Sequence, residues 1–320
     1  MKRRLPALVL GFVLASAVPA AGSAATTDWM TGLPRTTVAI PSWPNGKKVA
    51  ICFILDVEHW GLYHGPNFRP DTASRNPDYL NESFREYAIH WGVPRVARVF
   101  AAEGVPLSVA LNAVFPQNYP DTWQTLRSIV PKAPIVAHGM NNSTELLPLN
   151  GTLADQEAYV RKTLDTIQQS TGVRPKGWQS PNVEANAQTF TATAAQGITY
   201  TLDAMDSDVL SSLQTNAGPL LELPYPTVPV DMGQFFQRSV NASEVADLWM
   251  DYARTLDGEA QADPSRPAVA VVIGVHPFVM GTPDGAAAMH RTLQTLKALP
   301  TVWLADTDAV AAYAASGGRR

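Results

Sequence analysis

The chain has 320 residues, of which 46% are hydrophobic, enough for one large α/β domain with a buried core. Its net charge of −4 and the scatter of its 24 basic residues exclude nucleic acid and anionic membrane surfaces as expected partners. A single cysteine, Cys52, excludes an intrachain disulfide framework, and its place in an apolar run predicts a buried side chain.

The first residues have the features of an export signal. Lys2, Arg3 and Arg4 precede an apolar run from Leu5 to Val18, and small residues follow that run. A membrane anchor is the alternative, but the run is shorter than the ~20 residues that a spanning helix needs. We therefore predict a cleaved signal peptide over residues 1–25 and an exported catalytic domain, periplasmic or secreted, over residues 26–320. Cleavage leaves 21 basic and 28 acidic residues, a net charge of about −7.

After residue 48, short apolar runs alternate with helical patterns, which is typical of βα units around a parallel sheet. The expected strands are 49–57, 107–113, 134–140, 177–181, 200–205, 220–225, 268–277 and 301–306. The expected helices are 94–103, 122–130, 153–171, 185–196, 243–256 and 286–299. Seven or eight such units favour a barrel, although their spacing leaves an open sheet as an alternative. Segments 61–81 and 224–239 are rich in loop-forming residues and predict two long loops.

Polar residues stand at the C-terminal ends of these strands, where active sites form in parallel α/β proteins. They are Asp56, Glu58, His138, Ser180, Asp203, Tyr225 and His276. Each has a structural explanation when taken alone, but two histidines and two carboxylates at one edge favour a functional site. A carboxylate can deprotonate water and a histidine can protonate a leaving nitrogen, so this set suits hydrolysis.

The sequence lacks the motifs of other common chemistries. No Gly-x-Ser-x-Gly segment supports a seryl nucleophile. Neither a phosphate-binding loop ending in Gly-Lys-Ser/Thr nor a dinucleotide fingerprint occurs. Nucleotide chemistry is therefore not expected.

Three segments resemble motifs of the polysaccharide deacetylase superfamily, carbohydrate esterases that remove N-acetyl groups from chitin and peptidoglycan. "ILDVEHW" resembles the acidic motif, "IVAHGMNN" the first histidine motif and "GVHPFVMGTP" the final histidine motif. The likeness extends from about Trp43 to about Tyr313. "SWPNGKKVAICFIL", "REYAIHWGVPRVARVF", "TGVRPKGWQSP" and "LLELPY" are similar to the branch of cofactor-independent allantoinases and peptidoglycan deacetylase-like proteins. The resemblance implies one α/β domain, a distorted (β/α) barrel of about seven strands.

The resemblance also implies roles for four residues. Asp56 matches the general base that activates water, and Glu58 matches the metal-binding aspartate. His138 matches the first metal histidine. His276 matches the histidine that protonates the leaving group or stabilises the oxyanion. We therefore predict Asp56, Glu58 and His276 as catalytic.

Two departures from the family pattern weaken the expected metal site. Asn142 stands where the metal-dependent deacetylases have a second histidine, four residues after His138. Gln179 and Ser180 replace the arginine motif that orients the base. Since zinc prefers imidazole or thiolate to an amide, we expect no firmly bound cofactor and at most a weak zinc site at Glu58 and His138. The residues predicted to bind substrate are His59, Asn142, Trp178, Ser180 and Tyr225.

The expected activity is hydrolysis of a non-peptide C–N bond in an N-acetylated sugar or a linear amide. One alternative is an allantoinase-like amidohydrolase, which an export signal disfavours. The other is a catalytically inactive carbohydrate-binding protein of the cell wall. The losses at Asn142 and Gln179 favour this alternative, and the four retained polar residues oppose it.

Overall fold

The computed structural model describes residues 25–318; the predicted signal peptide lies outside them except for residue 25. Its strands form one sheet in the order β1-β2-β8-β9-β7-β6-β5-β4-β3-β10, with β11 paired to β3. They are β1 (Thr26–Thr27), β2 (Pro34–Thr37), β3 (Val49–Val57), β4 (Ser108–Leu111), β5 (Ile135–Ala137), β6 (Gly177–Trp178), β7 (Tyr200–Ala204), β8 (Ser211–Thr215), β9 (Gly218–Pro224), β10 (Val269–Val275) and β11 (Val302–Ala305). All eight expected strands are present, within a few residues of their expected bounds.

Strand β3 is the centre of the fold because neighbours flank it on both sides along its length. β10 pairs in parallel with its residues 49–55, while β11 pairs with 49–52 and β4 with 54–57. Pairing is parallel from β10 through β7 to β9 and antiparallel from β9 to β1. β10 and β9 touch without pairing, so the sheet curls into a barrel that no ladder closes. The expected barrel class is confirmed.

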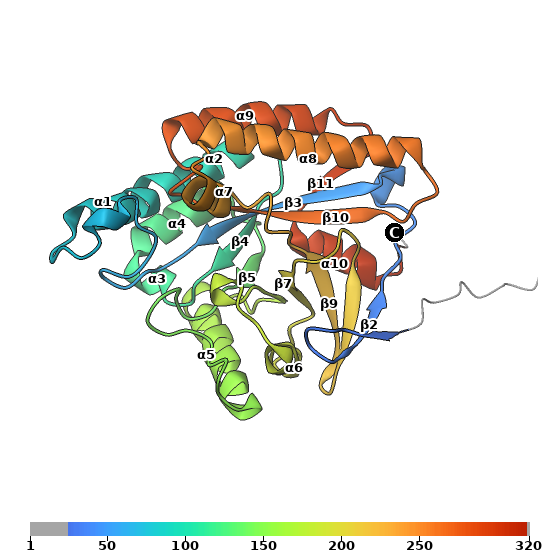
Figure 1. Cartoon of the computed structure of the whole chain (residues 1–320), viewed down its shortest axis with the longest axis horizontal. Helices are drawn as coiled ribbons and strands as arrows, with labels where there is room; N and C mark the ends of the chain where they lie inside the picture. The colour runs from blue at the N-terminus through green and yellow to red at the C-terminus, as the bar shows by residue number, and fades with distance from the viewer. Residues whose placement is uncertain (1–24, 319–320) are drawn as a thin grey trace, which may run out of the picture.

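Most helices cover the outside of this sheet, whereas the last one packs against the opposite face of β3 through Val310, Ala311 and Ala314 (Figure 1). The helices are α1 (Tyr79–Tyr87), α2 (Val93–Glu103), α3 (Phe115–Asn118), α4 (Pro120–Ile129), α5 (Leu153–Thr171), α6 (Ala187–Ala195), α7 (Asp231–Arg238), α8 (Ala242–Ala262), α9 (Pro283–Lys297) and α10 (Thr307–Ala315). α8 and α9 lie side by side along one face, and α7 lies beside the end of β10. No helix within residues 25–318 is long and apolar enough to cross a bilayer.

Side chains that alternate along the strands form two hydrophobic cores, an outer one and an inner one. Ile51, Phe53 and Leu55 of β3 pack in the outer core against the helices. Ala50, Cys52 and Ile54 point the other way, into the inner core with residues of β7, β9 and β10. Since side chains alternate with a period of two, Asp56 continues the inner row. The strand sequence therefore aims this carboxylate into the barrel.

The two predicted long loops are partly wrong. Segment 61–81 already contains the start of α1, and segment 224–239 contains α7. Helix α7 buries Asp231 and Gln234, and packs Phe235 and Phe236 against the outer core. This tertiary burial stabilises a helix of only eight residues, too short to be stable alone.

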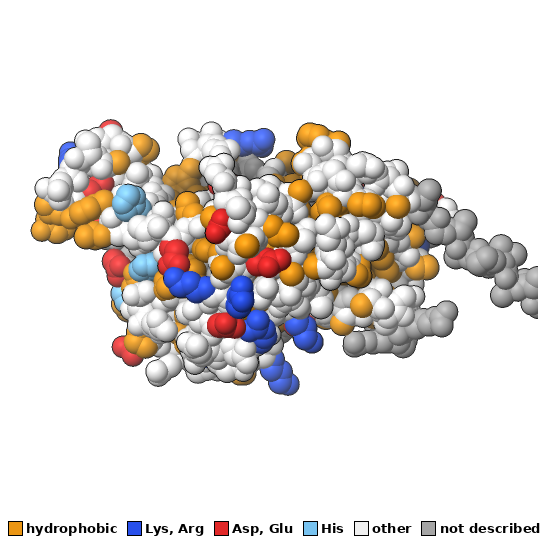
Figure 2. All heavy atoms as spheres, turned by 90° about the horizontal axis from the view of Figure 1, so that it is seen from below, with side chains coloured by type: hydrophobic (Ala, Val, Ile, Leu, Met, Phe, Trp, Pro, Cys, Tyr) orange, Lys and Arg blue, Asp and Glu red, His pale blue; other side chains and the backbone are white. Residues whose placement is uncertain are grey.

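The sequence analysis also missed the antiparallel strand β8, which pairs with β9 from Ser211 to Thr215. On the face shown in Figure 2, basic side chains gather near the centre with acidic ones among them.

Candidate active site

The candidate site lies at the C-terminal ends of the parallel strands and is built from the inner rows of the barrel. Asp56 ends the inner row of β3, and His138 follows Val136 of β5 by two positions. Tyr225 follows Leu223 of β9 by two positions, and His276 follows Val272 of β10 by four, with Gly274 between them on the same face. Because alternate residues share one face, the chain brings four distant segments together at one opening.

Asp56 and His276 form the centre of the site. His276 Nε2 lies 3.6 Å from Asp56 Oδ2, and both side chains are buried. Gln179 Nε2 donates to Asp56 Oδ1 at 3.2 Å, whereas Oδ2 has no hydrogen-bond partner among the described residues. Burial raises the pKa of Asp56 to about 6, more than the positive charges of His276 and His138 lower it.

A second carboxylate supports His276 from the other side of its ring. Asp231, the first residue of α7, accepts from Nδ1 of His276 at 2.7 Å and from its backbone N–H at 2.7 Å. Burial opposes a charge on His276, but Asp56, Asp231 and Glu58 outweigh it and raise its pKa to about 10. Asp231 thus directs Nε2 toward the pocket and favours the imidazolium.

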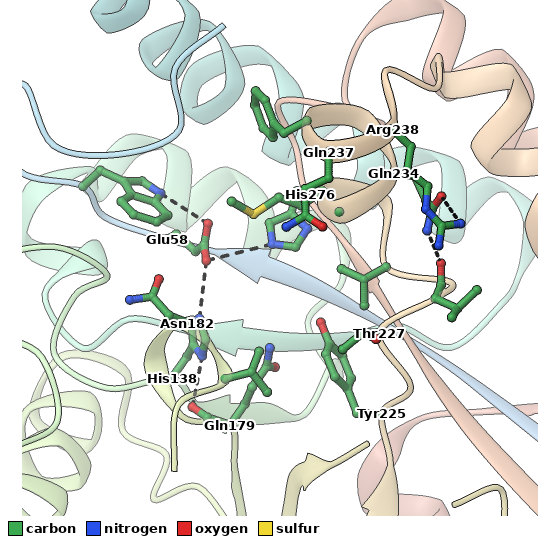
Figure 3. A pocket seen from close by; sticks show the side chains of 17 residues that line it. Glu58, His138, Gln179, Asn182, Tyr225, Thr227, Gln234, Gln237, Arg238 and His276 are labelled. Carbon is green, nitrogen blue, oxygen red and sulfur yellow. Dashed lines mark hydrogen bonds and ion pairs between the residues drawn. The ribbon is translucent and has the colours of Figure 1, made fainter. Parts of the chain in front are cut away.

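Glu58 lies between the two histidines (Figure 3). Its Oε1 is 3.4 Å from His138 Nε2 and 4.0 Å from His276 Nε2, and its Oε2 accepts from the Trp60 indole at 3.2 Å. Burial would raise the pKa of Glu58, but His138 and His276 outweigh it and the pKa is lowered. Glu58 is therefore an ionised carboxylate within a network of donors.

His138 and Asn142 complete that network. His138 Nδ1 donates to the Gln179 carbonyl at 3.0 Å, and burial lowers its pKa less than Glu58 and Asp56 raise it. The Asn142 amide donates to Glu58 Oε1 and lies 3.1 Å from His138 Nε2. Asn112 Nδ2 in turn donates to Asn142 Oδ1 at 3.0 Å.

These donors do not fit a firmly held late divalent metal. A structural or catalytic zinc takes at least three protein ligands, mostly imidazole, thiolate or carboxylate. Among the described residues, no group of three such side chains has metal-binding geometry. At the position where the resemblance expects a third ligand, the Asn142 amide is hydrogen-bonded to Glu58 and to Asn112. Of the three positions that the resemblance assigns to the metal, only Glu58 and His138 carry a carboxylate or an imidazole, and these two already contact each other.

A pocket of about 490 Å³ opens above this network. Its floor includes Glu58, His138, Gln179, Tyr225 and His276, and much of its wall belongs to α7 and the segment that precedes it. A smaller cavity of about 20 Å³ touches Asp56, Glu58 and Trp60, and is large enough for one water molecule. Asp56 thus lies beneath the pocket floor.

Three of the residues predicted to bind substrate, Trp178, Ser180 and Asn142, do not line this pocket. Trp178 and Ser180 lie on the outer side of β6 and its extension, because Gly177 and Gln179 occupy the inner row. The Trp178 indole donates to Ser180 Oγ, which donates to Asp203 Oδ2 at 2.8 Å. Asn142 lies beneath the floor. All three are buried hydrogen-bonded or core residues that do not line the pocket.

His59 also lies outside the pocket lining, against the Tyr119 ring at 5.8 Å between centroids. Of the five predicted substrate contacts, Tyr225 alone lines the pocket. Burial raises the pKa of the Tyr225 hydroxyl well above its ordinary value, which keeps it a neutral donor.

The sequence analysis missed Asp231, Asn112 and Arg238. Asn112 is at the inner position after Ala110 of β4, so its place at a strand end could have revealed it. Asp231 and Arg238 lie on the helix that was predicted to be a loop. No local sequence signal pairs Asp231 with His276.

The fold and the position of the polar cluster can be compared with those of known proteins. The chain has the barrel fold of the polysaccharide deacetylases, with its polar cluster at the C-terminal strand ends. No model of a protein family matches the sequence, and no curated protein matches it.

Solved structures share the fold over most of the chain. A protein assigned as a polysaccharide deacetylase from Mycobacterium smegmatis is 24% identical, with a TM-score of 0.72, over 88% of this chain and 95% of that one. A protein with the same assignment from Pseudomonas aeruginosa is 21% identical, with a TM-score of 0.74, over 88% and 96%. PuuE allantoinase is 22% identical, with a TM-score of 0.73, over 88% and 95%. At these identities the likeness establishes the fold, as the resemblance predicted.

Proposed function

We propose that this protein is an exported hydrolase of non-peptide C–N bonds that acts on an N-acetylated sugar or a linear amide. The observation that carries this proposal is the Asp56–His276 pair. The two groups lie 3.6 Å apart, with pKa values of about 6 and about 10. When the surroundings of two neighbouring groups separate their pKa values in this way, the group with the lower pKa can act as the base and the other as the acid. The solved structures of the same fold, which include named deacetylases and an allantoinase, support the reaction class.

The first step is attack of water on the amide carbonyl. Ionised Asp56 takes a proton from water through Oδ2, the oxygen without a partner among the described residues. The oxygen of water forms a bond to the carbonyl carbon, and the carbonyl electrons move onto its oxygen. The neutral Tyr225 hydroxyl at the pocket floor is placed to donate to this oxyanion.

The second step is loss of the amine. His276 donates the Nε2 proton to the leaving nitrogen while the oxyanion re-forms the C=O bond and the C–N bond breaks, which releases a carboxylic acid and an amine. The proton that Asp56 took from water then passes to His276, 3.6 Å away, and restores both groups. Asp231 keeps the His276 ring in position through Nδ1. All of these proton transfers use groups of the chain, so we propose that hydrolysis needs no firmly bound metal.

The direct test is release of acetate and amine by the mature chain, residues 26–320. Chitin oligomers, peptidoglycan fragments and simple acetamides are supplied, each with and without a chelator. We expect turnover in both conditions and a loss of 10²–10⁴-fold in Asp56→Asn, with an unchanged circular dichroism spectrum. If Asp56→Asn keeps full activity, Asp56 is structural and Glu58 becomes the candidate base.

An allantoinase-like activity is the second candidate, favoured by the likeness to PuuE allantoinase. Incubation with allantoin separates the two, and its ring opening is followed by liquid chromatography because that reaction releases neither acetate nor a free amine. Binding of N-acetylated oligosaccharides without turnover would instead identify the inactive carbohydrate-binding alternative.

We also propose export through residues 1–25. Fractionation of cells that express the full chain, compared with a chain lacking residues 2–25, tests this. We expect the full chain outside the cytoplasm and shortened by the length of the signal. Full-length protein retained in the cytoplasm would contradict export.

A further inference from the structure

The wall of the pocket carries one permanent cation. Among the described lining residues, Arg238 is the only lysine or arginine, and the other ionisable groups are Glu58, His138, Tyr225 and His276 at the floor. The rest of the wall consists mainly of neutral amides and apolar side chains, such as Asn182, Gln237, Val228 and Phe236. Arg238 is therefore separate in position and in charge from the catalytic network.

Helix α7 fixes the distance between Arg238 and the proposed catalytic residue His276. α7 begins at Asp231, which holds His276, and ends at Arg238. Seven residues of α-helix separate their Cα atoms by roughly 10 Å. Figure 3 shows Arg238 on the far side of the pocket from Glu58, with Gln234 beside it.

The guanidinium of Arg238 is held only weakly. It is exposed and makes no ion pair among the described residues; its Nη1 donates to the neutral Gln234 Oε1 at 3.4 Å. Gln234 is buried and donates in turn to the Val228 carbonyl at 2.6 Å, which ties this end of α7 to the pocket wall. Because a guanidinium has five N–H donors in a planar fork, most of them remain free to bind a carboxylate.

We propose that Arg238 is a specificity-determining residue that binds a carboxylate on the substrate, several ångströms from the bond that is cleaved. The inference rests on the proposed hydrolase function and narrows its substrate to an acidic amide or an acidic N-acetyl sugar. Neutral N-acetylated compounds fit the same pocket without this contact. Binding energy at such a remote group is the same in the ground state and the transition state, so it lowers KM for the acidic substrate.

Two pairs of compounds test whether the pocket prefers an acidic substrate to a neutral one. N-acetylmuramic acid and N-acetylglucosamine differ by a lactyl carboxylate, and 4-acetamidobutanoate and 4-acetamidobutanamide differ by a terminal carboxylate. Binding is measured by isothermal titration calorimetry on Asp56→Asn, in which the expected loss of turnover keeps the ligand intact, and turnover is measured on the wild type. We expect the acidic member of at least one pair to bind about 10-fold more tightly, and its advantage to shrink as salt is raised.

Variants of Arg238 identify the contact. Arg238→Gln should abolish the acidic preference, raising KM for the acidic substrate about 10-fold with kcat unchanged, and should change KM for the neutral one less than 2-fold. Arg238→Lys keeps the charge without the planar fork and should retain part of the preference. Arg254→Gln, at an exposed position on α8 outside the pocket, is the matched control and should leave both substrates unaffected.

The binding measurement separates this inference from the proposed function. If the acidic probe binds through Arg238 but no amide is hydrolysed, the hydrolase proposal fails and the anion site stands. If amides are hydrolysed and both members of each pair bind equally, or Arg238→Gln weakens both equally, the anion site is refuted.

Discussion

Asp231 and His276 are joined by two hydrogen bonds of 2.7 Å, one to each carboxylate oxygen, although 45 residues separate them in the sequence. One bond fixes the strand end through the backbone N–H of His276, and the other fixes the ring through Nδ1. The first residue of a short helix thus sets both the position and the protonation of a histidine on a distant strand. This relationship explains why the imidazole faces Asp56.

Replacement of this carboxylate should impair the proposed acid. We expect Asp231→Asn to lower kcat about 10²-fold, because the amide keeps the size of the side chain but removes the charge that favours imidazolium. The upper apparent pKa of the rate profile should fall, which a purely structural loss would not cause. Asp247→Asn, at an exposed position on α8, is the matched control. An unchanged profile in Asp231→Asn would contradict the role of this pair.

The plot of kcat/KM against pH should rise at low pH, reach a plateau and fall at high pH. The proposed base must be ionised, so kcat/KM rises as the pH increases through about 6, the pKa of Asp56. The proposed acid must be protonated, so the rate falls as the pH increases through about 10, the pKa of His276. Because the two groups interact, these two pKa values are apparent values of the pair. A rate that increases steadily with hydroxide over the whole range would refute this assignment.

We predict that Asn142 limits how strongly the site binds metal. Its amide lies against Glu58 and 3.1 Å from His138 Nε2, so a histidine here would bring a third donor to the same point. We expect zinc to be substoichiometric in the wild type after dialysis against a chelator and to be retained more tightly by Asn142→His. Mass spectrometry of the dialysed proteins measures this.

The control for that measurement is the double variant Asn142→His with His138→Ala, which should lose the gained affinity. Stoichiometric zinc in the dialysed wild type, with activity lost on its removal, would contradict the metal-free proposal.

Ser180 should affect stability rather than turnover. Its hydroxyl joins the Trp178 indole to Asp203 within buried surroundings, away from the pocket. Ser180→Ala removes the partner of the Trp178 indole N–H and of Asp203 Oδ2, and we expect a loss of about 1–3 kcal/mol in the free energy of unfolding, measured by denaturant titration. Turnover should remain within 2-fold of the wild type. Ser128→Ala, which is exposed on α4, should change neither quantity. A large loss of kcat in Ser180→Ala without a loss of stability would show that Ser180 has a role in the active site.

Period-two alternation could have corrected part of the sequence analysis. The sequence analysis assigned Trp178 and Ser180 to the site because both stand at the end of a strand. However, Gly177 and Gln179 share the inner face with Asp56 and His276, so their neighbours must face outward. The same count places Asn112 inside the barrel and Asp203 outside it.

Local sequence patterns were enough to predict the parallel strands, most of the helices and the four central polar residues. A buried strand such as Val49–Val57 is apolar except for Asp56, so the carboxylate near its end stands out. Helix α7 and its contacts depend instead on tertiary packing, because eight residues with Asp231 and Arg238 at the ends carry no stable helical signal of their own. Long-range burial stabilises that helix, and it brings Asp231 to His276 and Arg238 to the pocket wall.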